Sequence, residues 1–130
     1  MARDEVLITA DALAGLDEVD LLDVRWRLGE AQGDGLRRYL DGHLPGARFL
    51  DLEAVLTRHG EPIEGRHPLP DVDTLEEGLG ALGVNGAKLI VVYDEAGSFA
   101  AARAWWVLRW AGLDVRVLDG GIGAWTGQGR

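Results

Sequence analysis

The chain of 130 residues contains no cysteine, and this absence excludes one class of chemistry outright. Without a thiol, these residues form no disulfide, offer no thiolate ligand to a metal and hold no thiol nucleophile. Long apolar runs are absent too, since none approaches the roughly 18 residues that a membrane-spanning helix needs. The segment that follows Met1 lacks the apolar stretch of a signal peptide. We therefore expect a cytoplasmic protein with no membrane partner.

Basic residues are scarce, with 13 Lys and Arg against 22 Asp and Glu and a net charge of −9. Nucleic-acid binding needs a basic face, and the basic residues here are dispersed, so we expect no nucleic-acid partner. The three histidines, His43, His59 and His67, are too far apart for a compact helical metal motif. We expect neither a metal site nor another cofactor.

Short apolar segments alternate with helical patterns along the whole chain. A hydrophobic content of 47% is enough for the core of one domain of this length. The predicted strands cover residues 7–8, 19–24, 48–50, 89–93 and 115–118. Alternating strands and helices with short connections indicate an α/β fold, in which a mainly parallel sheet carries helices on both faces.

The helices are predicted from apolar spacing and from residues that favour helix ends. Thr9 is a good N-cap for a helix over 10–15, with Leu13 facing the core. Asp71 or Asp73 begins a helix that Gly83 ends. The predicted helices cover 10–15, 36–41, 71–82, 99–111 and 122–125, and the predicted loops and turns cover 29–35, 42–47 and 61–70.

The most informative feature is the junction between the strand at 89–93 and the helix at 99–111. In α/β proteins such junctions direct backbone N–H groups and a helix N-terminus at an anion or a reacting group. The loop between them reads Asp94, Glu95, Ala96, Gly97 and Ser98, and Phe99 follows. The position of the loop favours a catalytic site, whereas Asp94 and the missing thiol argue against catalysis by this chain.

Four stretches together resemble a rhodanese-homology domain. They are Asp23-Val24-Arg25, the run Tyr-Leu-Asp-Gly-His-Leu-Pro-Gly-Ala at 39–47, the junction from Tyr93-Asp94 to Arg103-Ala104-Trp105-Trp106, and Val-Leu-Asp-Gly-Gly at 117–121 with Trp125. They span almost the whole chain in the family's order. The resemblance implies a rhodanese-like three-layer fold with a central, mainly parallel, five-stranded sheet.

The sequence is most similar to the N-terminal, non-catalytic domain of the tandem thiosulfate/3-mercaptopyruvate sulfurtransferases. That domain has Tyr-Asp at the loop, then Gly-Ser-Phe, then a Trp-Trp helix, as this chain has at Tyr93-Asp94, 97–99 and 105–106. The resemblance implies that residues 1–130 are one domain, the first half of a protein whose second rhodanese domain is catalytic. The family transfers a sulfane sulfur, from thiosulfate to cyanide or from 3-mercaptopyruvate, through a cysteine persulfide.

The resemblance places Asp94 at the position of the family's catalytic cysteine, which implies no catalytic residue in this chain. Residues 94–99 then form a pseudo-active-site loop. A carboxylate has no sulfur to carry, and its oxygen is a poor nucleophile toward sulfane sulfur. We expect Asp94 to accept backbone N–H groups and to favour the positive end of the following helix.

Other motif residues have two interpretations each. Asp23 and Arg25 bind an anion or, as we favour, Arg25 holds a carboxylate or loop carbonyls near the sheet edge. His43 titrates near neutral pH or, as we favour, bonds to the backbone of its turn. Arg103 pairs with an acid or lies at a domain interface. Four glycines are expected to serve backbone geometry rather than ligand contact: Gly46, Gly97, Gly120 and Gly121.

Trp105 and Trp106 are neighbours on a predicted helix, so their side chains point about 100° apart. They cannot share one face, and we expect one tryptophan in the core and another partly exposed. Trp110 lies at helical spacing from Trp106. An exposed tryptophan on an acidic domain indicates a partner surface, such as a second rhodanese domain.

Three functions remain open from the sequence. The first is a structural domain of a sulfurtransferase, which predicts no turnover by this chain alone. The second is a stand-alone inactive rhodanese module that binds a small anion or a protein partner. The third, with the least support, is an unrelated enzyme that uses Asp94 as nucleophile or base.

Overall fold

The computed structural model describes residues 6–27, 31, 33–57, 69–95 and 99–127. One sheet holds the strands in the order β1-β5-β4-β2-β3, and every neighbouring pair is parallel. The strands are β1 (Leu7–Ile8), β2 (Val19–Asp23), β3 (Arg48–Phe49), β4 (Leu89–Tyr93) and β5 (Val115–Leu118). The parallel sheet confirms the predicted α/β fold class.

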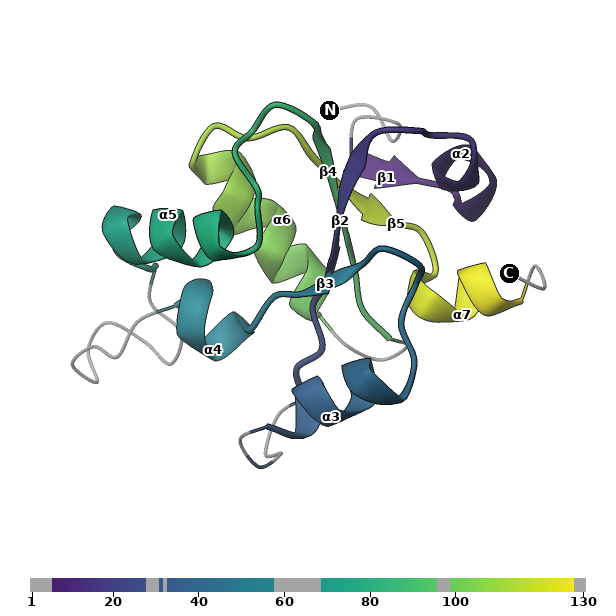
Figure 1. Ribbon diagram of the computed structural model, residues 1–130, viewed down its shortest axis with the longest axis horizontal. Helices are drawn as coiled ribbons and strands as arrows, with labels where there is room; N and C mark the ends of the chain where they lie inside the picture. Colours follow the sequence, from purple (N-terminus) through teal and green to yellow (C-terminus); the bar gives the residue numbers. More distant parts are fainter. Residues whose placement is uncertain (1–5, 28–30, 32, 58–68, 96–98, 128–130) are drawn as a thin grey trace.

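Helices cover both faces of the sheet (Figure 1). They are α2 (Ala10–Ala14), α3 (Asp34–Asp41), α4 (Leu52–Val55), α5 (Val72–Ala81), α6 (Ala100–Trp110) and α7 (Gly121–Thr126). α4, α5 and α6 lie on one side of the sheet and α2 and α7 on the other, while α3 lies at the end where β2 and β4 finish. None of the helices within the described ranges is long and apolar enough to span a bilayer.

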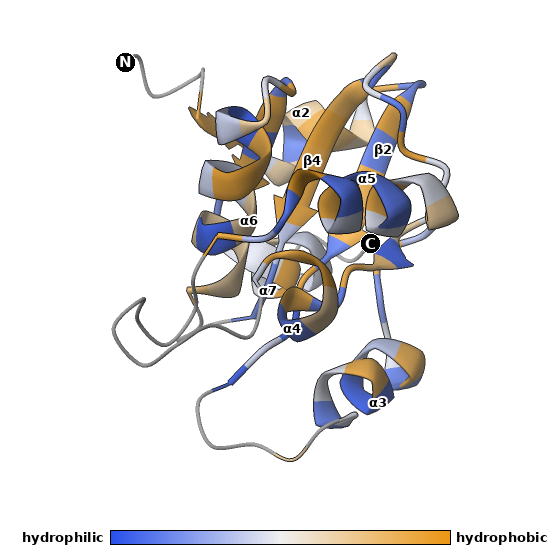
Figure 2. Cartoon of the chain, turned by 90° about the vertical axis from the view of Figure 1, so that its left-hand side faces the viewer, coloured by the Kyte–Doolittle hydropathy of each residue, from blue (hydrophilic) through white to orange (hydrophobic). Residues whose placement is uncertain are grey.

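The core has two parts, one on each face of the sheet. Along β4, Ile90 and Val92 pack toward α5 and α6, whereas Val91 and Tyr93 pack toward α2 and α7. All four side chains are fully buried, and β4 is hydrophobic along its length in Figure 2. The alternation follows from the two-residue period of a strand, and a strand covered on both faces needs apolar residues at every position.

The ends of α5 follow the predicted residues. The helix begins after Asp71, although the carboxylate of Asp71 makes no capping hydrogen bond. Gly83 ends it with a φ of 79°, and the Val84 N–H donates to the Leu79 carbonyl at 2.9 Å. This bond is the mark of a Schellman motif, which glycine favours because it adopts positive φ without strain.

The sequence predicts a loop over 29–35 and a helix from Leu36, but α3 already begins at Asp34. Gly33, with a φ of 92°, leads into the helix, and Asp34 and Gly35 belong to its first turn. Gly35 is buried, and a Cβ at this position would lie 2.2 Å from the carbonyl oxygen of Arg25. Close packing of the helix on the backbone after β2 therefore overrides the low helix propensity of glycine.

α4 was not predicted. Its N-cap is Asp51, whose carboxylate accepts the N–H groups of Glu53 at 3.0 Å and Ala54 at 3.3 Å. Leu52, the first residue of the helix, and Leu56, directly after its last residue, are both buried. Four residues are too few for a helical period to be detected, so the capping residue was the one available signal.

Gly35→Ala is expected to lower the free energy of unfolding by about 1–3 kcal/mol, the usual cost of overpacking. Its methyl group would clash with the Arg25 carbonyl and push α3 away from the sheet. Gly80→Ala in α5 is the matched control, since nothing lies within 4 Å of a Cβ there. The control should gain up to about 1 kcal/mol in urea unfolding. Equal stability of the two variants would contradict the packing argument.

Candidate functional site

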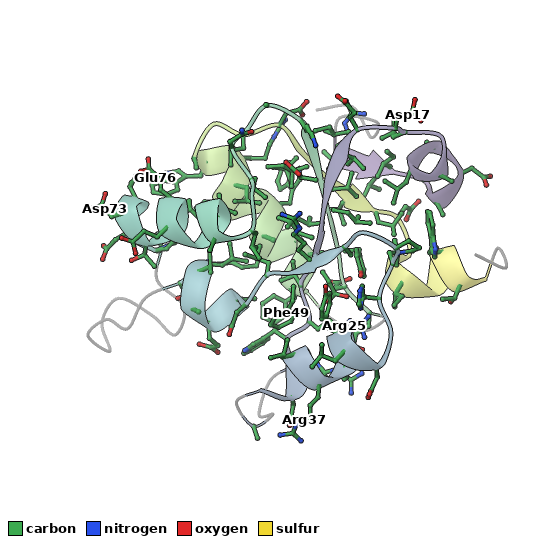
Figure 3. The ribbon with its side chains drawn as sticks, viewed as in Figure 1. Asp17, Arg25, Arg37, Phe49, Asp73 and Glu76 are labelled. Atoms are coloured by element: carbon green, nitrogen blue, oxygen red, sulfur yellow. The ribbon has the colours of Figure 1, made fainter. Side chains whose placement is uncertain are left out.

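Two motif segments meet at the carboxyl end of the sheet. β2 and β4 are neighbours in register, with Asp23 opposite Tyr93. Arg25 and Asp94 therefore leave the sheet at the same edge, and Figure 3 shows Arg25 there, on the side that faces α3. Parallel sheets carry their binding sites at this edge.

Asp94 connects β4 to α6 and caps the helix. Its Oδ2 atom accepts the N–H of Ala101, the second residue of α6, at 2.9 Å. Phe99 holds the N-cap position but has no side-chain acceptor, so Asp94 serves in its place from earlier in the loop. This is the backbone contact expected for Asp94, at the helix end that favours negative charge.

The backbone of Asp94 is fixed by the start of α7. Its carbonyl accepts the N–H of Ile122 at 2.9 Å, and a Cβ on Gly121 would lie 2.4 Å from the same carbonyl. Gly120 and Gly121 have φ values of 83° and 61°, and Gly46 in the turn after α3 has 78°. These three glycines serve backbone geometry as expected, whereas Gly97 lies outside the described residues.

Each of the three guanidinium nitrogens of Arg25 donates to the protein itself. Its Nε atom donates to both carboxylate oxygens of Asp23, at 3.1 and 3.0 Å. Its Nη1 atom donates to the Arg38 carbonyl at 2.9 Å, and its Nη2 atom donates to the Gly42 carbonyl. Asp23 is fully buried and Arg25 nearly so. The favoured interpretation was that Arg25 holds a carboxylate or loop carbonyls, and in the structure it holds both.

Tyr93 extends this buried network to the turn after α3. Its hydroxyl is hydrogen-bonded to Asp23 and accepts the N–H of Leu44 at 3.1 Å. Burial raises the pKa of Asp23, and the hydrogen bonds from Tyr93 and Arg25 offset part of that rise. Burial and the neighbouring carboxylate raise the pKa of Tyr93 well above its ordinary value, so the phenol stays protonated as a donor.

His43 contacts the backbone within the same turn. Its Nδ1 atom lies 2.7 Å from the Tyr39 carbonyl, and the two rings stack with centroids 3.9 Å apart. This is the favoured backbone contact. His59 and His67 lie outside the described residues.

Glu95 joins two arginines that the sequence analysis did not single out. Its Oε1 atom lies 2.8 Å from the Nε atom of Arg27 and 3.0 Å from the Nε atom of Arg38. Arg27 follows β2 and Arg38 belongs to α3, so both are distant from Glu95 along the chain. No local pattern brings them together, and only the sheet order does so.

Arg103 ties α6 to α4. Its Nη2 atom donates at 3.0 Å to the carbonyl of Leu56, the C-cap residue that follows α4, and burial lowers the pKa of Arg103. Arg103 thus meets a carbonyl at a helix C-terminus, where a cation is favourable. On the same helix Trp105 packs against the core and Trp106 is half-exposed, as the angle between them predicts.

The described part of the loop ends in an aromatic contact. Phe99 is exposed, and its ring meets Trp26 edge-on with centroids 5.2 Å apart. The Nε1 atom of Trp26 donates to Glu53 at 2.7 Å. Trp26 is a further residue that the sequence analysis missed. Ala96, Gly97 and Ser98 of the predicted loop lie outside the described residues.

Tyr93→Phe is expected to lower the free energy of unfolding by about 1–3 kcal/mol, because Asp23 loses a donor and Leu44 an acceptor in a buried site. Tyr39→Phe is the control, since it removes one partly buried bond to Ala47. That control should cost about 0.5–1.5 kcal/mol. Urea unfolding of both variants gives the comparison.

The cost of Tyr93→Phe should also depend on pH. The raised pKa of Asp23 means that the folded state holds its proton longer, so the Asp23 contribution to stability falls as pH rises above 3.8. Without the Tyr93 bond the pKa of Asp23 rises further and the fall continues to higher pH. The cost should therefore be larger at about pH 7 than at about pH 3, and equal costs would contradict this sign.

Asp94→Ala is expected to lower the free energy of unfolding by about 0.5–2 kcal/mol, the usual cost of a lost helix cap. Asp94→Asn keeps an acceptor for the Ala101 N–H and should retain most of that stability. Thermal or urea unfolding of the two variants measures the difference. An alanine variant as stable as the parent would show that the Asp94 hydrogen bond does not stabilise α6.

Comparison with known proteins agrees with this geometry. The family model described as the rhodanese-like domain matches residues 9–128. The putative thiosulfate sulfurtransferase SseB of Mycobacterium tuberculosis is 49% identical over 98% of this chain and 46% of its own length. A probable 3-mercaptopyruvate sulfurtransferase of Pseudomonas aeruginosa is 45% identical over 95% of this chain and 45% of its own length. The chain thus spans about half the length of these curated relatives.

Solved structures give the same result. SseA from Escherichia coli superposes with a TM-score of 0.84 at 38% identity, over 95% of this chain and 48% of that one. The 3-mercaptopyruvate sulfurtransferase from Leishmania major gives 0.82 at 28% identity, over 98% of this chain and 35% of that one. Sheet order, helix placement and sequence therefore agree, and the chain belongs to the rhodanese family, with homology to sulfurtransferases.

Proposed function

We propose that this chain is the N-terminal, non-catalytic domain of a cytoplasmic tandem sulfurtransferase. In this role it supports a second rhodanese domain, which carries sulfane sulfur from thiosulfate or 3-mercaptopyruvate. The observation that carries the proposal is Asp94. It lies at the strand-to-helix junction, and its carboxylate accepts a hydrogen bond from the first turn of α6.

Sulfur transfer needs a thiolate, whose pKa is lowered by backbone N–H groups and a helix N-terminus. Here the helix N-terminus holds a carboxylate, and the chain contains no cysteine. The carboxylate also opposes the approach of an anionic sulfur donor, because like charges repel strongly in a poorly solvated loop. The chain alone should therefore turn over no sulfur donor.

We place the second domain at the carboxyl edge of the sheet. Phe99 precedes α6, Leu36 and Leu40 belong to α3, and all three are exposed apolar residues. Exposed large apolar residues are typical of an interface. The relatives are about twice as long as this chain, which supports a second domain as the partner of these apolar residues.

A stand-alone inactive rhodanese module that binds a small anion or a protein partner is the second candidate. Arg27 and Arg38 favour it, because they place two cations on Glu95, the residue after Asp94, in a chain of net charge −9. This candidate predicts a measurable ligand for the isolated chain, whereas the first predicts a missing partner domain.

The intact mass of the natural protein, measured in its own cells, separates the two candidates. The tandem protein should have a mass near twice the 14.1 kDa of this chain. The isolated chain should form no thiocyanate from thiosulfate and cyanide. A natural mass near 14.1 kDa would overturn the tandem proposal and favour the binding module.

Asp94→Cys tests whether the junction is still shaped for sulfur chemistry. A thiol there should have a lowered pKa and should react with iodoacetamide about 10-fold faster or more than an ordinary thiol near neutral pH. With thiosulfate, its thiolate should take the outer sulfur as a persulfide and release sulfite, which adds one sulfur atom to the mass.

Ala111→Cys is the control, because Ala111 is exposed at the opposite end of the same helix, away from the junction. Its thiol should label at the ordinary rate and gain no sulfur. A folded Asp94→Cys protein that labels no faster than this control would count against a junction that stabilises anions.

A further inference from the structure

Two guanidinium groups from separate elements converge on a single carboxylate at the carboxyl edge of the sheet. The Oε1 atom of Glu95 lies 2.8 Å from the Nε atom of Arg27 and 3.0 Å from the Nε atom of Arg38. Arg27 comes from the segment after β2, Arg38 from the middle of α3, and Glu95 from the loop after β4. The cluster is therefore held by tertiary structure and not by one helix.

The exposure of the three side chains is unequal. The Arg27 side chain is 56% exposed and that of Arg38 is 22% exposed, whereas that of Glu95 is only 14% exposed. Solvent therefore reaches Arg27 most easily, whereas Arg38 and Glu95 lie largely below the surface. An anion arriving from solvent meets Arg27 first, and Glu95 is the group that it has to replace.

Arginine suits such an exchange because its planar guanidinium matches the oxygens of carboxylates and of other oxyanions. Arg25, the third arginine at this edge, is excluded, since Asp23 and the carbonyls of Arg38 and Gly42 use its donors. The Arg38 carbonyl bond to Arg25 also fixes the backbone from which the Arg38 side chain extends. One member of the pair is thus anchored before any ligand arrives.

We infer that Arg27 and Arg38 form a binding site for a small oxyanion, and that Glu95 occupies this site as an internal ligand. The site takes a carboxylate or a sulfur oxyanion when the Glu95 side chain is displaced. The apparent dissociation constant is then the intrinsic one divided by the fraction of molecules in which Glu95 has left. The inference does not depend on the tandem proposal, because the three residues belong to this chain.

Glu95→Gln tests the inference, since it removes the competing charge and keeps the size of the side chain. Amide and arginine Nε–H resonances of the full chain are followed by NMR during titration with sodium thiosulfate and, separately, sodium acetate. Sodium chloride keeps the ionic strength constant. We expect Glu95→Gln to bind at least one of the two anions about 10-fold more tightly than the parent, as an occupied site predicts.

The two anions distinguish the possible ligands. A larger gain for thiosulfate assigns the site to sulfur oxyanions, and a larger gain for acetate assigns it to carboxylates. The double variant Glu95→Gln with Arg27→Gln should lose the gain, because one cation of the pair is gone. Asp114→Asn, which frees Arg109 from an exposed ion pair of 3.6 Å elsewhere, should bind no better than the parent.

Two results would overturn the inference. One is a folded Glu95→Gln protein that binds neither anion more tightly than the parent. The other is a gain that persists in the double variant or appears equally in Asp114→Asn. If Glu95→Gln does not fold, Glu95→Asp carries the test, because its shorter carboxylate withdraws from the arginines. An unchanged affinity in Glu95→Asp would then count against the site.

Discussion

The bonds between Asp23, Arg25 and Tyr93 are the constraint on which the carboxyl edge of the sheet depends. An ion pair at full burial is costly unless every donor is satisfied, and here Arg25 also donates to carbonyls at Arg38 and Gly42. These bonds hold the end of α3 and the following turn against β2 and β4. Loss of either charge would leave its partner buried and uncompensated, so the network supports shape more than net stability.

The same edge shows a common electrostatic pattern, in which the chain supplies its own anion to each positive group. Asp94 meets the N-terminus of α6, Glu95 meets Arg27 and Arg38, and Asp23 meets Arg25. In an α/β fold these positive groups are the ones that hold anionic ligands. Under the proposed function, internal carboxylates at these three places keep the backbone of a binding edge while lowering its affinity for external anions.

Most of the fold was predictable because its signals are local. Apolar strands, Thr9 as a cap and Gly83 as a helix end each act within a few residues. The roles of Asp94 and the Asp-Gly-Gly turn were also within reach, since they are contacts with neighbouring backbone. The early start of α3 and the whole of α4 were missed, because close packing at Gly35 and a single cap at Asp51 leave no periodic pattern. The contacts of Glu95 with Arg27 and Arg38 depend on tertiary structure, and no sequence window contains them.

The sheet order has a consequence for how the domain is made. β1 and β5 are neighbours at one side of the sheet, with Leu7 opposite Val117 and Ile8 opposite Leu118. The first strand therefore has no partner until nearly the whole domain has been synthesised. Closing so long a loop is entropically slow, and parallel pairing adds to the delay. During translation β1 therefore stays without its sheet partner until β5 has emerged, and an unpaired strand edge is prone to aggregation in that interval.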